Sequence, residues 1–205
     1  MVKPPVQEPF LYRPDSWFEP LKWEHIFPHS PTQPIHVDLG AGDGGLIHAQ
    51  ARKHPHINFL AVERLLGRAR KIARKSCRDK LENLRVLRIE ASYAVECLFP
   101  KKTIAAITVL FPDPWPKRRH QKNRLIQPAF LDLCASSLQP NGWLAIKTDD
   151  KSYFDHITET LAGCETLRVW KGAHQKELLP EITDFERDFL KEGRPIYFVA
   201  AQSIA

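Results

Sequence analysis

The sequence has few cysteines and no long apolar segment. Its four cysteines are widely separated, at Cys77, Cys97, Cys134 and Cys164. They lack the close pairs that zinc sites use, so we expect reduced thiols and no metal site. No apolar run approaches the roughly 18–20 residues needed to span a bilayer. The first residues, Met-Val-Lys-Pro-Pro, lack the apolar core of a signal peptide. These absences predict a cytoplasmic protein that makes no membrane contact.

The composition is that of an ordinary globular protein, with 43% hydrophobic and 26% charged residues. The net charge is +6, and the positive residues are unevenly distributed. Seven of them precede the first acid of the segment 64–80: Arg64, Arg68, Arg70, Lys71, Arg74, Lys75 and Arg78. Charges that repel one another in this way favour an anionic partner, although a solvated helix face is the alternative.

Proline is concentrated near the N-terminus, where residues 1–34 contain eight of the 17 prolines. We expect an irregular N-terminal arm there, whose aromatic residues pack onto a domain formed by residues 35–205. Apolar runs predict strands at 35–39, 57–62, 84–89, 104–111, 143–148, 165–169 and 196–201. Helical patterns lie at 45–54, 64–79, 92–98, 128–138 and 151–161. In 64–79, we expect the apolar residues to face the sheet: Leu65, Leu66, Ala69, Ile72 and Ala73. The alternation predicts an α/β fold with a mostly parallel seven-stranded sheet and helices on both faces.

A glycine-rich loop follows the first predicted strand, over residues 38–45 (Asp-Leu-Gly-Ala-Gly-Asp-Gly-Gly). Gly40 and Gly42 allow the backbone to approach a ligand closely. Glu63, at the end of the second strand, is suited to holding a ribose diol. The loop also satisfies G-x-G-x-x-G, so an NAD-dependent oxidoreductase is a competing interpretation, and a turn that binds nothing is a minor third.

Two acids of this loop favour S-adenosylmethionine over a dinucleotide. Asp38 precedes the first glycine, where it would meet a methionine ammonium group. Asp43 places a negative charge where a dinucleotide would put its pyrophosphate. The loop therefore favours a methyltransferase over a dehydrogenase.

A second loop follows the strand at 104–111 and reads Pro112-Asp113-Pro114-Trp115-Pro116-Lys117. Its prolines restrict the chain and present Asp113 beyond the strand end, where ligands of open α/β sheets bind. Five basic residues follow within 117–124: Lys117, Arg118, Arg119, Lys122 and Arg124. We expect them to hold RNA phosphates together with the segment 64–80. A rigid surface loop with solubilising charges is the alternative, and the signature of exocyclic-amine methyltransferases is not met.

The stretch from Phe111 to Lys117, with Arg119-His120, resembles the signature of the bacterial tRNA (guanine-N7)-methyltransferases. The resemblance runs from about Trp23 to Phe198 and includes Thr148-Asp149 and the stretch 183–186. It implies a class I methyltransferase (Rossmann-like) fold, S-adenosylmethionine as cofactor, and the variable-loop guanine of tRNA as target.

The resemblance also implies roles for individual residues. The implied cofactor contacts, with the glycines of the loop, are Asp38, Gly40, Gly42, Glu63, Glu90 and Asp113. Asp113 is in addition the implied catalytic acid. The implied substrate contacts are Lys117, Asp149, Thr183, Asp184, Phe185 and Glu186. The chain departs from the family pattern where Asp38 replaces a usual Glu, Glu90 a usual Asp and Leu110 a usual Asn.

Two of these substrate assignments have structural alternatives. Thr183-x-x-Glu186 is also a capping box, and Asp149 is placed to cap the helix at 151–161. For the whole chain, a non-catalytic RNA-binding protein on a methyltransferase scaffold is the competing hypothesis. The acids Asp38, Glu63 and Asp113 argue against it, because RNA binding alone needs no carboxylates in a cofactor cleft. The sequence is compatible with a monomer or a homodimer.

Overall fold

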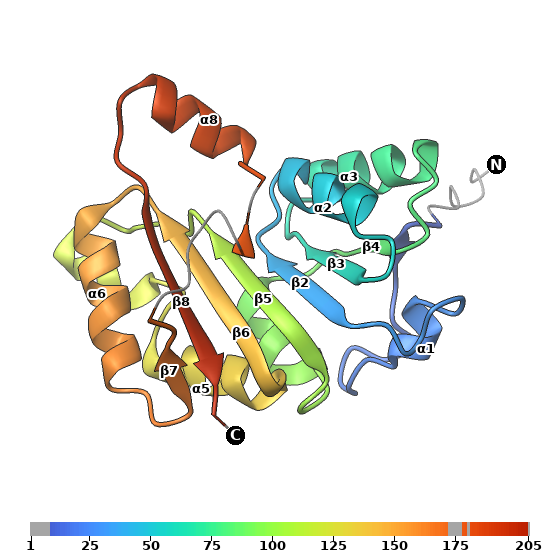
Figure 1. Cartoon of the computed structure of the whole chain (residues 1–205), viewed down its shortest axis with the longest axis horizontal. Coiled ribbons are helices and arrows are strands. Elements are labelled where there is room, and N and C mark those ends of the chain that lie inside the picture. The colour runs from blue at the N-terminus through green and yellow to red at the C-terminus, as the bar shows by residue number, and fades with distance from the viewer. Residues whose placement is uncertain (1–8, 172–177, 180, 205) are drawn as a thin grey trace.

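The computed structural model describes residues 9–171, 178–179 and 181–204, apart from the side chain of Asp184. Within them an eight-stranded sheet runs in the order β1-β4-β3-β2-β5-β6-β8-β7 (Figure 1). The strands are β1 (Leu11–Tyr12), β2 (Ile35–Leu39), β3 (Asn58–Val62), β4 (Leu84–Leu87), β5 (Ile104–Leu110), β6 (Leu138–Thr148), β7 (Leu167–Val169) and β8 (Tyr197–Ser203). Only β8 is antiparallel to its neighbours β6 and β7. The predicted α/β class and mostly parallel sheet are confirmed.

The sheet has one strand more than the sequence predicted, because the N-terminal arm contributes β1. Leu11 and Tyr12 pair in parallel with Val86 and Leu87 of β4. A strand of two residues in a proline-rich segment shows no periodicity from which it can be recognised. The described part of the arm thus runs from the edge of the sheet toward β2.

Packing of the arm onto the domain follows the prediction in part. A short helix, α1 (Trp23–Ile26), lies within the arm. Trp23, Ile26 and Phe27 are all buried in the main core. Phe18, by contrast, is 86% exposed. Burial of the aromatic side chains near β2 fixes the arm to the domain.

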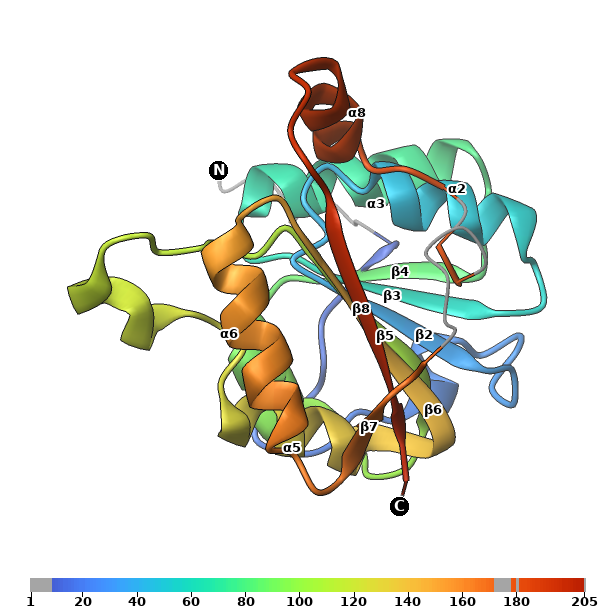
Figure 2. The ribbon, with the colours of Figure 1, turned by 60° about the vertical axis from the view of Figure 1, so that its left-hand side comes forward.

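Helices cover both faces of the sheet (Figures 1 and 2). They are α2 (Gly45–Lys53), α3 (Leu66–Arg78), α4 (Ala91–Tyr93), the π-helical turn η1 (Ala94–Leu98), the 3-10 helix η2 (Arg118–Asn123), α5 (Pro128–Ser137), α6 (Lys151–Ala162) and α8 (Asp184–Lys191). In β3 the side chains alternate, as a strand requires. Phe59 and Ala61 pack with α2 and α3, whereas Leu60 and Val62 join the core shared with α5 and α6. No helix of the described part is long and apolar enough to cross a membrane.

Helix α3 buries most of the face that the sequence predicted. Ala69, Ile72 and Ala73 are at most 4% exposed. Leu65 was predicted to face the sheet, but it precedes the helix and is 45% exposed. Its backbone N–H donates to Glu63 Oε1 at 2.7 Å, in an extended conformation that turns the side chain outward.

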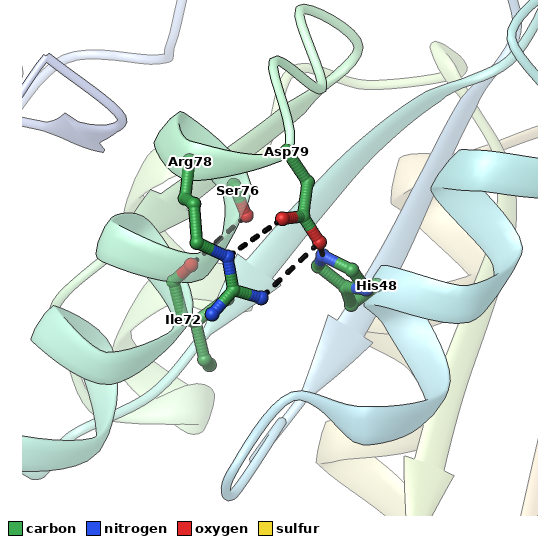
Figure 3. A network of polar contacts seen from close by, with 5 residues as sticks. All are labelled: His48, Ile72, Ser76, Arg78 and Asp79. Atoms are coloured by element: carbon green, nitrogen blue, oxygen red, sulfur yellow. Dashed lines mark hydrogen bonds and ion pairs between the residues drawn. The ribbon is translucent and has the colours of Figure 1, made fainter.

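Polar contacts join α2 to the end of α3 (Figure 3). His48 Nε2 lies 3.0 Å from Asp79 Oδ2, and Arg78 Nε donates to Asp79 Oδ1 at 2.8 Å. Burial lowers the pKa of His48, and Lys75 lowers it further. The contacts that meet at Asp79 thus lie between the two helices.

Candidate active site

A cavity of about 1080 Å³ opens at the carboxyl ends of the central strands. It lies where the strand order reverses between β2 and β5, the position at which open α/β sheets bind their ligands. Nine of the predicted site residues line it: Asp38, Gly40, Gly42, Glu63, Glu90, Asp113, Asp149, Thr183 and Phe185. Lys117 and Glu186 are not among the lining residues, and the side chain of Asp184 lies outside the described part.

The glycine loop is shaped by close packing against two other elements. Gly44 has φ +72°, and a Cβ there would lie 2.6 Å from Ile72 Cγ1 of α3. Gly42 has φ +59°, and a Cβ there would lie 3.6 Å from the ring of Phe185. Glycine is required at Gly44 because α3 leaves no room for a side chain.

Glu63 is held rigidly on the cavity wall. Its Oε2 accepts from Gly42 N at 3.0 Å, and its Oε1 accepts from Leu65 N at 2.7 Å. The side chain is nearly buried, at 5% residue exposure. Two backbone donors thus fix a carboxylate beside the glycine loop, as a ribose-binding acid requires.

Asp38 is buried on the cavity wall to the same extent as Glu63, with 5% of its surface exposed. Thr108 Oγ1 donates to Asp38 Oδ1 at 2.7 Å. Burial raises the pKa of Asp38 to about 6, although the Thr108 hydrogen bond lowers it and the nearby Glu63 adds to the rise. The carboxylate is thus poised for a cationic ligand group, which would offset the cost of burying its charge.

Glu90 begins α4 and is exposed on the cavity wall. Its Oε2 accepts from Tyr93 N at 3.0 Å and also from the Ser92 hydroxyl. The acid therefore serves as the helix cap while it faces the cavity. Capping of α4 is therefore a structural reason for an acid at position 90, apart from any contact with a cofactor.

The negative charge of Asp43 is compensated from α3. Lys71 Nζ lies 2.7 Å and Arg68 Nε 3.8 Å from its carboxylate oxygens. The loop is therefore less repulsive to an anion than the sequence indicated, and Asp43 is weak evidence against a dinucleotide. The same contacts, with the Arg78–Asp79 pair, show that the basic residues of α3 are not all uncompensated.

The loop after β5 has an unusual backbone. Phe111 and Trp115 are non-glycine residues with φ of +53° and +44°. Arg124, which the sequence analysis assigned to phosphate binding, is only 4% exposed. Its Nε donates to Pro114 O at 2.8 Å, and its guanidinium lies 4.8 Å from the centre of the Tyr153 ring. Arg124 therefore holds the loop through Pro114 and also lines the cavity. Asp113 is exposed at the cavity.

Lys117 stands outside the cavity, at the start of η2. The segment projects from the body of the molecule (Figure 2, yellow-green). Its exposed cations are Lys117, Arg118, Arg119 and Lys122. Trp115, at the base of the segment, is 37% exposed and packs edge-on against His120.

Helix α8 lies beyond the ends of β5 and β6 (Figure 1). Thr183 Oγ1 accepts from Glu186 N at 2.9 Å, so its capping role is confirmed, and Thr183 also lines the cavity. Phe185 is 48% exposed and faces the cavity. Glu186, assigned to substrate contact from the sequence, is 1% exposed and lies 2.8 Å from Lys147 Nζ. This burial favours a positioning role for Glu186.

Asp149 faces the cavity and pairs with Arg194. The alternative role as a helix cap is wrong, because Asp150 caps α6 by accepting from Tyr153 N at 2.7 Å. Arg194 also lies 4.0 Å from the centre of the Phe189 ring. Arg194 and Phe189 were not found from the sequence, since they reach the site only through the packing of α8.

The donor set fits S-adenosylmethionine. A buried carboxylate suits its ammonium group, a rigid second carboxylate suits its ribose, and the glycine loop lets the ligand approach the backbone. The cavity also offers apolar surface from Leu39, Ala91 and Phe130. The fold and this cavity define a class I, S-adenosylmethionine-dependent methyltransferase.

Comparison with known proteins narrows this class. A family model described as "Putative methyltransferase" matches residues 32–199. The chain is 33% identical over 195 residues to the tRNA (guanine-N(7)-)-methyltransferase of Enterococcus faecalis, covering 94% of this chain and 89% of that one. It is 32% identical over 184 residues to the protein of that name from Streptococcus thermophilus, covering 88% and 85%. The chain belongs to this methyltransferase family.

A solved structure shows the same fold at low identity. The 16S rRNA methyltransferase KamB superposes with a TM-score of 0.61 at 16% identity, covering 88% of this chain and 93% of that one. Family membership and fold together overturn the dehydrogenase interpretation of the glycine loop.

Proposed function

We propose that this protein transfers the methyl group of S-adenosylmethionine to N7 of the variable-loop guanine of tRNA. One observation carries the proposal: Asp113 is exposed beyond β5 on the same cavity as Asp38 and Glu63. A methyl donor held by the two buried acids thus faces a carboxylate suited to a guanine. The relatives from Enterococcus faecalis and Streptococcus thermophilus are named as methyltransferases of guanine N7 in tRNA.

The cofactor end of the cavity is formed by acids of different character. We assign Asp38 to the ammonium group, Glu63 to the ribose diol and Glu90 to the adenine side. The glycines Gly40 and Gly42 allow the ligand to lie against the loop. When bound, the cofactor supplies an electrophilic methyl group on sulfur.

Guanine N7 carries an in-plane lone pair, so it needs no proton removed before it attacks. The protein's main task is then to align N7 with the methyl group, which can account for much of the rate enhancement. Asp113 would accept hydrogen bonds from the N1–H and N2 amino groups and offset the positive charge that develops on the base. It acts as an orienting carboxylate rather than as a base.

The remaining residues of the site are assigned to the RNA. Thr183, Phe185 and Asp149 line the same cavity as Asp113 and would contact the guanine. Lys117 and its neighbours in η2 are exposed and would hold phosphates, which makes binding strongly salt-dependent. Glu186 would act on the guanine only by placing α8. Such a substrate places the protein in the cytoplasm.

Incubation with labelled S-adenosylmethionine and total tRNA, followed by nucleoside analysis, tests the proposal. We expect 7-methylguanosine as the labelled product. Asp113→Asn should lower turnover by roughly 10²–10³, as for other preorganised charge-stabilising groups, and leave S-adenosylhomocysteine binding within a few-fold. Tight tRNA binding without any labelled nucleoside would instead support a non-catalytic RNA-binding protein.

A further inference from the structure

Thr108 and Asp38 are directly opposed on neighbouring strands. Strands β2 and β5 are parallel, and the Cα atoms of the two residues are partners in the register. Thr108 Oγ1 donates to Asp38 Oδ1 at 2.7 Å, while the other acceptor in reach, Val37 O, is 3.4 Å away. The shorter of the two hydrogen bonds of the hydroxyl is therefore the one to the carboxylate.

The two residues face the cavity differently. Asp38 lines it, whereas Thr108 is not among the described lining residues and is 6% exposed. A ligand would touch the carboxylate but not the hydroxyl. The hydrogen bond engages Oδ1 and leaves Oδ2 available for the ligand.

We propose that Thr108 is a positioning residue for cofactor binding, which orients Asp38 so that Oδ2 meets the ammonium group of S-adenosylmethionine. The inference rests on the proposed function. Torsion about the Cβ–Cγ bond of an aspartate is broad, so an unanchored carboxylate samples many orientations. A single short hydrogen bond to one oxygen selects one of them before the ligand arrives.

The composition of β5 supports a specific role for this hydroxyl. The strand reads Ile-Ala-Ala-Ile-Thr-Val-Leu, in which Thr108 is the single polar residue. Valine would match its shape in this buried parallel strand and would bury no polar atom. The hydroxyl stands at the position of β5 whose register partner is the cavity acid Asp38.

The Thr108 hydrogen bond also affects the pKa of Asp38. Burial disfavours the charged form of Asp38, and the Thr108 hydrogen bond opposes that effect. Glu63 also raises the pKa of Asp38. The other charged residues that line the cavity are Asp43, Arg68, Glu90, Glu96, Asp113, Arg124, Asp149, Asp188 and Arg194. Replacing Thr108 leaves all of these in place, so a changed titration of cofactor binding reports the lost hydrogen bond.

The test compares Thr108→Val with Thr108→Ser by calorimetry, using two probes. S-adenosylhomocysteine carries the ammonium group, whereas 5′-methylthioadenosine has the same nucleoside without the amino acid. We expect Thr108→Val to weaken S-adenosylhomocysteine binding roughly tenfold or more, the effect of losing a hydrogen bond to a charged group. Binding of 5′-methylthioadenosine should be unchanged, which also shows that the variant is folded.

The pH dependence supplies the second readout. In the wild type, S-adenosylhomocysteine affinity should fall as the pH drops through about 6, where Asp38 takes up a proton. In Thr108→Val the fall should begin at higher pH, and Thr108→Ser should restore the wild-type profile.

Two results would overturn the inference: equal weakening of both probes by Thr108→Val, or no weakening of S-adenosylhomocysteine binding. Failure of the wild type to bind either probe would refute the proposed function itself, a result distinct from both.

Discussion

Lys147 of β6 and Glu186 of α8 form a buried ion pair, with 2.8 Å between Nζ and Oε2 and side chains that are 0% and 2% exposed. Burial lowers the pKa of Lys147, while Glu186 raises it. Desolvation offsets much of the attraction in such a pair, so its net contribution to stability is small. Its consequence is geometric, because it attaches α8 to the sheet and thereby places Phe185 beside Gly42.

Removing one partner of this pair should destabilise the fold. Lys147→Met removes the cation that lies 2.8 Å from the buried Glu186 carboxylate, and we expect the free energy of unfolding to fall by about 3–5 kcal/mol. Urea denaturation measures the loss. The matched control is Lys151→Met, which removes an exposed pair with Asp155 and should cost less than about 1 kcal/mol.

The double variant Lys147→Met/Glu186→Leu separates stability from positioning. It should recover most of the lost stability, since no charge remains buried, yet still bind S-adenosylhomocysteine more weakly than the wild type. A Lys147→Met variant as stable as Lys151→Met would contradict the role of the pair.

Gly44 should be intolerant of a side chain. Its φ is +72°, and a Cβ would lie 2.6 Å from Ile72 Cγ1, so Gly44→Ala should cost about 1–3 kcal/mol of stability through overpacking and strain. Gly67→Ala is the control, because Gly67 lies in α3 with nothing within 4 Å of its Cβ position. That change should stabilise the protein by up to about 1 kcal/mol. Thermal unfolding measures both effects. If the midpoint temperatures of the two variants shifted in the same direction, the close packing of Gly44 against α3 would be contradicted.

Asp38→Asn should stabilise the protein at neutral pH while it weakens cofactor binding. Burial raises the pKa of Asp38 from 3.8 to about 6, so the folded state binds a proton more tightly than the unfolded chain. The contribution of this group to stability is greatest below pH 3.8, declines as the pH rises to about 6, and stays low above it.

Asparagine has no charge to bury, so the variant should be more stable than the wild type above that range, by up to about 3 kcal/mol. The difference should shrink toward acid pH. Urea denaturation across pH measures it, and a stability difference independent of pH would show that Asp38 titrates normally.

The exposed cations of η2 should set the salt dependence of RNA binding. If Lys117 contacts a phosphate, Lys117→Ala should lower the slope of log affinity against log salt by about 0.7–0.9. Lys101→Ala is the control, because Lys101 is exposed in the turn before β5, at the amino end of the sheet. Filter binding of tRNA over a range of salt gives both slopes, and identical slopes would remove Lys117 from the RNA interface.

Local patterns were enough to predict the parallel sheet and many of the residues that line the cavity. The glycine loop, Asp38, Glu63 and Asp113 each stand at a strand end, and parallel strands bring such ends to one edge. Contacts between distant elements carry no such signal. Thr108 reaches Asp38 through strand register, and Arg194 reaches Asp149 through the packing of α8. Arg124 shows the opposite error, since the sequence placed it in an exposed basic run but it is buried and donates to Pro114 O.

The central claim is that guanine N7 accepts the methyl group. It is tested most directly with two synthetic tRNAs that differ only at the variable-loop guanine, one carrying guanine and the other 7-deazaguanine. The latter has a carbon in place of N7 and keeps the N1 and N2 groups that Asp113 would contact. We expect labelling of the first tRNA alone and comparable binding of both. Equal labelling of the two would contradict it.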